Sequence, residues 1–149
     1  AIVDALDHGE AFYDVMGAAV DSLGGEPLKA FTPAQERVAA EIDRLLAVLG
    51  LPTRPESLAR HQLVAAFASI RDMLFPEMPV EALTIYAQAA DQVARFETAG
   101  APGMFELEPD LAIEKAVLGL ALFEPVLLAF RRLSHERLVH QTLGPGTKH

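Results

Sequence analysis

Apolar residues recur three and four positions apart along most of the chain, and no short run alternates with a period of two. Positions three and four apart share one face of an α-helix, whereas a half-buried strand needs strict alternation. The β-branched residues are scattered and do not gather into strand-like runs. The pattern therefore predicts an all-α fold, a single bundle of about five helices.

The longest predicted helix spans Asp110 to Leu143 and contains the most apolar stretch of the chain, Ala116–Phe130. Thirteen of these fifteen residues are apolar or glycine, and the exceptions are Glu124 and Pro125. A helix that is apolar on every side is expected to be buried, which makes this segment the predicted central helix of the bundle. Pro125 removes a backbone donor, so we expect a kink near it.

Residues 1–23 carry apolar side chains at alternating steps of four and three, interrupted by Gly9. This pattern predicts an N-terminal linker or dimerisation helix, and the alternative is an amphipathic helix that packs on its own domain. Glycine costs about 1 kcal/mol inside a helix, so we expect a break near Gly9. A helical regulatory domain would follow over residues 24–149. The candidate dimerisation residues are Ile2, Leu6, Tyr13, Met16, Val20 and Leu23.

Local start and stop signals predict a helix after Thr32. Thr32 is a good N-cap, Pro33 suits the first helical position, and Gln35 completes a capping box. Gly50 is the expected left-handed C-cap, and Pro52 prevents continuation. The predicted buried stripe consists of Val38, Ile42, Leu45 and Leu49.

Two further helices are predicted before the last one. Thr53–Glu56 repeats the start signal for a helix that runs to about Phe75. An alanine-rich helix then covers about Val80 to Ala99. The buried stripe expected for the first of these two helices is Leu63, Phe67, Ile70 and Leu74.

Composition bounds the class of protein. The chain has 149 residues, 51% hydrophobic and 22% charged, which is typical of a globular domain. A net charge of -9 argues against unaided binding to nucleic acid or an anionic membrane. The absence of cysteine excludes thiolate chemistry and suits a cytoplasmic location. The chain begins without a methionine or a signal peptide, so we expect it to be part of a longer protein.

Catalytic and metal-binding motifs are not found in the sequence. No phosphate loop or nucleophile elbow occurs, and His135 and His140 are five apart and do not share a helix face. His61 is expected to be a partly buried, hydrogen-bonded side chain. We therefore predict no enzymatic activity, no cofactor and no metal site.

Glu124 is the one anomaly in the apolar run. A carboxylate there must be paired, protonated or directed at a cavity if it is buried. The alternative is that it reaches solvent or pairs with an arginine of a neighbouring helix. Arg131, Arg132 and Arg137 form a dense basic patch that we interpret as a solvated or ion-paired face.

The segment Ile113–Glu136, with its Ala-Val-Leu-Gly and Leu-Leu-Ala-Phe-Arg-Arg-Leu texture, resembles the closing helix of the C-terminal domains of certain MerR-type transcriptional regulators. Tyr86–Ala90 and Val3–Asp7 are similar as well, and in that family Val3–Asp7 would be the tail of a winged-helix DNA-binding domain. The chain departs from the metal-sensing members, which use cysteines, and from the multidrug-type members with a β-rich ligand domain.

The resemblance implies the effector-sensing or dimerisation domain of a bacterial, homodimeric, cytoplasmic MerR-like regulator, which contacts DNA only through another domain. A possible effector is small and mainly apolar. Its predicted pocket has Phe67, Tyr86, Phe123 and Phe130 as walls and Glu124 as polar anchor. The alternatives are a ligand-free helical interaction module and the ligand-binding domain of a TetR-like regulator.

Overall fold

The computed structural model describes residues 29–51, 53–54, 56–99 and 108–144. These residues form four α-helices and one short 3-10 helix, and no strand occurs among them. The all-α class is confirmed, with four α-helices in the described ranges where about five were expected for the chain. The candidate dimerisation residues between Ile2 and Leu23, and the break expected near Gly9, lie outside the described residues.

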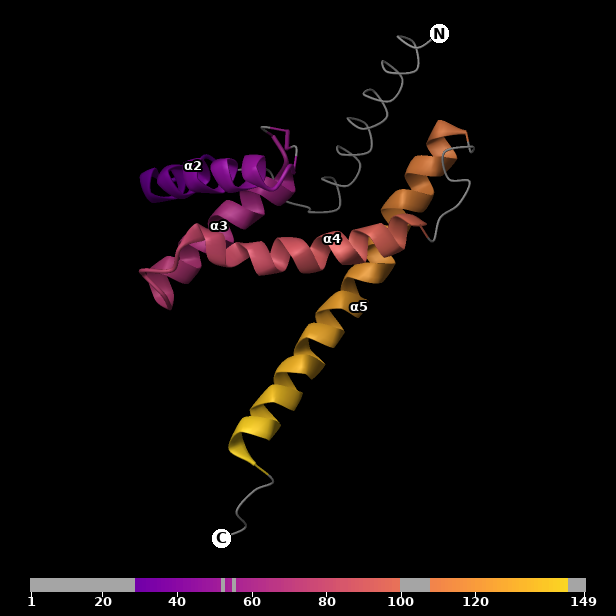
Figure 1. Cartoon of the computed structure of the whole chain (residues 1–149). Coiled ribbons are helices and arrows are strands. Elements are labelled where there is room, and N and C mark those ends of the chain that lie inside the picture. The colour runs from indigo at the N-terminus through magenta and orange to yellow at the C-terminus, as the bar shows by residue number, and fades with distance from the viewer. Residues whose placement is uncertain (1–28, 52, 55, 100–107, 145–149) are drawn as a thin grey trace. The chain divides into compact units, whose positions relative to one another are not determined.

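The helices fall into two compact units, Ala1–Gly103 and Met104–His149, where the sequence suggested a single bundle. The described part of the first unit contains α2 (Pro33–Val48), α3 (Leu58–Met73), the 3-10 helix η1 (Val80–Leu83) and α4 (Thr84–Ala99) (Figure 1). The second unit contains α5 (Pro109–Leu143).

Helix α2 begins with the predicted capping box. The Gln35 amide donates to Thr32 Oγ1 at 3.2 Å, and the Thr32 amide donates to Gln35 Oε1 at 3.0 Å. Pro33 occupies the first turn, where its missing N–H removes nothing from the helix. The predicted start of this helix is confirmed.

The end of α2 is a Schellman motif built on Gly50. Its φ of 68° lies in the left-handed region that favours glycine. The Gly50 amide donates to the Ala47 carbonyl at 3.2 Å, and the Leu51 amide donates to the Leu46 carbonyl at 2.9 Å. These two bonds satisfy carbonyls that the last turn leaves without a helical partner, and the predicted C-cap is confirmed.

Helix α3 starts later than the sequence indicated. Its N-cap is Ser57, whose Oγ accepts the Arg60 amide at 3.3 Å, and not Thr53. Serine ranks above threonine as an N-cap, so residue type agrees with the observed start at Ser57. The buried stripe is also rotated: Val64 is fully buried, whereas Leu74, predicted to be buried, follows the helix end and is exposed.

The core of the first unit lies where α2 and α3 pack together and η1 joins them (Figure 1). Ile42 and Phe67 are its largest members and are exposed by 1% or less. Helix α4 adds no buried residue to this core. The core residues are Val38, Ala39, Ile42, Leu45, Leu46, Val64, Phe67 and Val80.

Helix α5 does not form the buried centre that its apolar run predicted. It is continuous through Pro125, and every residue from Ala121 to Leu143 is exposed. The burial predicted for Ala116–Phe130 is not seen within the unit that contains α5, and its place as a central helix stays a prediction. The physical reason is that a helix apolar on all sides needs a cover on several sides, and composition does not say which molecule supplies it.

Candidate interaction surface

Helix α5 carries the largest set of exposed apolar side chains in the described part of the chain. Single exposed apolar residues are common, but soluble monomers rarely expose large contiguous apolar patches, and those that do often bind something through them. These side chains are therefore the leading candidate for a functional surface. They are Leu111, Leu118, Leu120, Leu122, Phe123, Val126, Leu127, Leu128, Phe130, Leu133, Leu138, Val139 and Leu143.

One face of α5 carries an uninterrupted apolar seam. Seven positions at alternating steps of four and three share this face, as in a heptad repeat. None is charged, and the next position in the series is Arg137. We call these residues the α5 seam: Ala112, Ala116, Gly119, Phe123, Val126, Phe130 and Leu133.

The two halves of the α5 seam differ in size and exposure. The first half holds alanine and glycine, with Ala112 buried and Ala116 and Gly119 half-buried. The second half holds two phenylalanines, a valine and a leucine, all exposed. A Cβ built on Gly119 would meet nothing within 4 Å, so the surface beside it is open.

The face of α5 roughly opposite the seam carries charged groups. Glu114, Glu124, Arg132 and His135 lie there at helical spacing, and all are exposed. Glu124, the anomaly of the apolar run, makes no hydrogen bond or ion pair with another described residue. Its side chain is exposed within the unit that contains α5. Val117, Ala121 and Leu128 lie on the same face, so α5 is apolar on both sides between Ala116 and Phe130 and the charged groups lie among apolar ones.

The predicted effector pocket draws its residues from both units. Phe67 lies inside the core of the first unit, 1% exposed, with the Arg71 guanidinium 4.5 Å from its ring centroid. Tyr86 of the same unit is on the surface, 61% exposed. Phe123, Glu124 and Phe130 belong to the second unit and are exposed. The pocket stays a prediction, with Phe67 already packed in the core.

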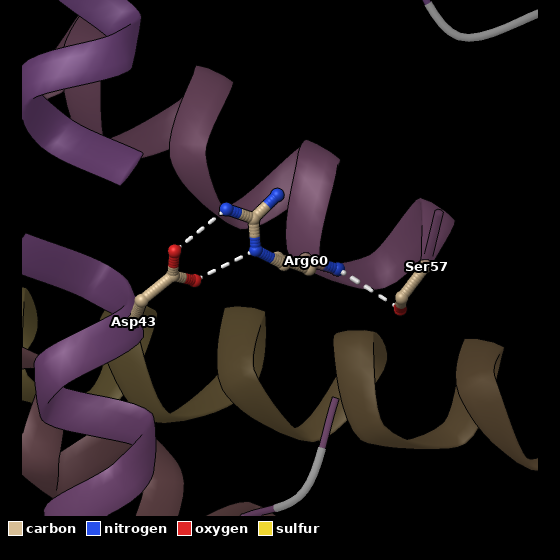
Figure 2. A network of polar contacts seen from close by, with 3 residues as sticks. All are labelled: Asp43, Ser57 and Arg60. Carbon is tan, nitrogen blue, oxygen red and sulfur yellow. Dashed lines mark hydrogen bonds and ion pairs between the residues drawn. The ribbon is translucent and has the colours of Figure 1, made fainter. Parts of the chain in front are cut away.

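The charged residues on α2 and α3 form ion pairs with one another. Arg60 Nε donates to Asp43 Oδ1 and Arg60 Nη2 donates to Asp43 Oδ2, both at 2.7 Å (Figure 2). The Arg60 amide also bonds the Ser57 cap, so one residue joins the start of α3 to α2. The hydrogen bonds from Arg60 hold the pKa of Asp43 below its ordinary value. Such a carboxylate stays ionised and is unsuited to general acid catalysis.

A second pair repeats this arrangement further along the same helices. Arg71 donates from both terminal nitrogens to Glu41, and its Nε donates to the Met78 carbonyl. Hydrogen bonding from Arg71 lowers the pKa of Glu41. Both arginines therefore hold helices together, a structural role.

The histidines do not assemble a metal site in the described part of the chain. His61 is half-buried and stacks on Phe31, with ring centroids 4.4 Å apart and an interplanar angle of 19°. His135 and His140 are exposed on α5. No group of three or more histidine, aspartate or glutamate side chains is placed to hold a metal among the described residues.

Comparison with protein-family models, with curated proteins and with solved structures found no match. None of the helices within the described ranges is both long enough and apolar enough to cross a membrane.

Sequence reasoning missed the α5 seam as a surface, although its signal was present. The four-and-three spacing found in residues 1–23 also runs unbroken over Ala112–Leu133. The apolar residues around the rest of that helix concealed the seam, since they suggested burial on all sides. The ion pairs of Arg60 and Arg71 had no sequence signal, because their partners lie 17 and 30 residues away.

Proposed function

We propose that this chain is the regulatory part of a MerR-like transcriptional regulator and that its main task is to hold two copies together. The family is supported by the resemblance of Ile113–Glu136 to the closing helix of such domains. DNA would be contacted by a separate domain, as that resemblance implies. Assembly is supported by the α5 seam.

The single observation that carries the assembly role is the exposure of the large apolar residues of the α5 seam. Full burial of a valine, leucine or phenylalanine side chain contributes about 1.5–3 kcal/mol. Phe123, Val126, Phe130 and Leu133 would together contribute several kcal/mol, a large fraction of the roughly 5–15 kcal/mol that stabilises a domain. Their exposure to water therefore favours a second surface that covers them.

Assembly is better supported than effector sensing, since Phe67 is packed in the core and Glu124 is exposed. Sensing of a small apolar molecule is the second candidate role. It is tested by a thermal-shift and native-mass screen of the purified protein against cell extract. A bound compound whose stabilisation is lost in Tyr86→Ala would support sensing, and the absence of any stabilising compound would remove its basis.

The assembly role is tested by fusing the chain to a DNA-binding module that occupies its operator only as a dimer. Operator binding at micromolar protein is the expected result. The matched control is the same fusion carrying Phe130→Asp, which places a charge on the seam and should abolish binding. A wild-type fusion that binds no better than this control would contradict the proposed function.

A further inference from the structure

We propose that the end of α3, where the chain turns towards η1 and α4 (Figure 1), docks a basic amphipathic helix of another protein. Three consecutive large apolar side chains are exposed there, each by more than half of its surface. We call them the α3 tip: Met73, Leu74 and Phe75. The tip belongs to the first unit, so this inference goes beyond the assembly role proposed for α5 and does not depend on it.

The backbone of the α3 tip is held in a hydrogen-bonded turn. The amides of Leu74 and Phe75 both donate to the Ile70 carbonyl at 2.9 Å, and the Met78 amide donates to the Phe75 carbonyl at 3.1 Å. Pro76, inside this turn, fixes its own φ. The tip is therefore preorganised, which reduces the entropy that a partner must remove on binding.

The α3 tip contributes nothing to the core of the first unit. Phe67 before it and Val80 after it are core residues, but the three tip side chains are neither in the core nor packed against it. Soluble domains rarely expose adjacent large apolar side chains, and those that do often bind a protein through them. A protein contact therefore accounts for the tip better than a role in folding.

Exposed carboxylates border the tip, and we call them the acidic rim: Asp72, Glu77 and Glu81. None of the three forms a hydrogen bond or an ion pair with another described residue. The pKa of Arg71 is raised first by its hydrogen bonds to Glu41 and then by the charges of Glu81 and Glu77, which places both rim carboxylates near it. Because Glu41 already neutralises this arginine, the rim keeps a net negative charge.

The chemistry of the partner follows from this arrangement. No lysine or arginine occurs between positions 72 and 94, so the sequence around the tip supplies no further cation. An apolar centre with an anionic border is complemented by an apolar surface with a cationic border. An amphipathic helix whose apolar stripe is flanked by lysine or arginine presents both features on one side. The same negative charge disfavours nucleic acid and anionic membranes.

The probe for this site is a fluorescent helical peptide of leucine and lysine, about four turns long, titrated with the full chain and followed by anisotropy. We expect saturable binding at micromolar protein that weakens as salt is raised, and no binding of the matched peptide with glutamate in place of lysine. Equal binding of the two peptides would overturn the inference, because the acidic rim would then have no role.

Two pairs of variants locate the binding on the chain. Phe75→Ser should weaken it about tenfold, whereas Phe96→Ser, at an exposed ring of α4, should leave it unchanged. Glu77→Lys should weaken it about threefold at low salt, consistent with one exposed charge contact reversed. Glu114→Lys on α5 changes the net charge equally and should have no such effect. Circular dichroism and urea unfolding should show all four variants folded as the wild type.

The results separate this site from the α5 seam and from a lipid surface. Binding that is unchanged in both Phe75→Ser and Glu77→Lys overturns the inference, whether or not the chain dimerises. A chain that is monomeric but binds the cationic peptide through the tip contradicts the proposed assembly and supports the docking site. Vesicles of phosphatidylglycerol and phosphatidylcholine should not bind. Vesicle binding that is lost in Phe75→Ser would make the tip a membrane contact and overturn the inference.

Discussion

The Arg71 guanidinium binds the Glu41 carboxylate at two points, Nη1 to Oε1 at 2.9 Å and Nη2 to Oε2 at 2.8 Å, and so joins α3 to α2. Arg71 Nε donates to the Met78 carbonyl at 2.9 Å, which ties the loop before η1 to the same group. Its planar face lies over the Phe67 ring. The Arg71 side chain thus connects α2, α3 and the loop before η1 beside the core of the first unit.

Replacement of this arginine by lysine should destabilise the first unit by about 1–2 kcal/mol. Lysine keeps the charge but loses the planar fork and the stacking on Phe67, so the hydrogen bonds to Glu41 and Met78 cannot all be made. The measurement is urea unfolding followed by circular dichroism. The matched control is Arg95→Lys, whose exposed pair with Asp91 within α4 should be replaced without measurable effect. An equal loss of unfolding free energy in Arg71→Lys and Arg95→Lys would contradict this role of Arg71.

Acid should weaken the same helix pair. The pKa values of Glu41 and Asp43 are lowered by hydrogen bonds from Arg71 and Arg60 respectively. A lowered pKa stabilises the folded state above the unfolded pKa, here 4.5 for Glu41 and 3.8 for Asp43, and this stabilisation is lost as pH falls through the folded pKa. The free energy of unfolding should therefore fall below about pH 4.5. Glu41→Gln should be less stable at pH 7 and show a shallower acid decline, and an unchanged decline would contradict this account.

Truncation of the core should have a much larger effect than truncation of the surface. Phe67→Ala removes a fully buried ring and should cost about 3–5 kcal/mol of unfolding free energy. Phe96→Ala in α4, where the ring is 72% exposed, should change stability by less than about 0.5 kcal/mol. Both changes in unfolding free energy are to be measured by chemical denaturation of the monomer at low concentration. Similar losses of unfolding free energy in the two variants would contradict the placement of Phe67 in the core.

Alanine at two glycines should have effects of opposite sign. Gly50 has a φ of 68°, so Gly50→Ala should cost about 1 kcal/mol through backbone strain alone, since nothing lies within 4 Å of the new Cβ. Gly119 lies within α5, and a Cβ there would also meet nothing within 4 Å. Gly119→Ala should therefore stabilise the isolated helix by about 1 kcal/mol. Chemical denaturation of each variant measures both effects.

Local features of the fold were predictable from sequence, and long-range ones were not. Thr32, Gln35 and Gly50 act within a few residues of themselves, so their side-chain and backbone preferences were enough to predict both ends of α2. The Arg71–Glu41 pair spans 30 residues and depends on how α2 and α3 pack, which residue types do not encode. For α5, apolar composition predicts that the helix needs a cover. Composition alone does not distinguish a cover supplied by the same chain from one supplied by a second copy.

The most direct test of the central claim is sedimentation velocity of the wild-type chain and Phe130→Asp across the micromolar range. The account predicts a wild-type dimer that dissociates on dilution and a variant that is monomeric at every concentration with unchanged helical circular dichroism. Phe96→Asp, a charge placed on an exposed apolar site of α4, is the control and should remain dimeric. A wild-type chain that is strictly monomeric, or a Phe130→Asp variant that dimerises as the wild type does, would contradict the claim that the α5 seam joins two copies.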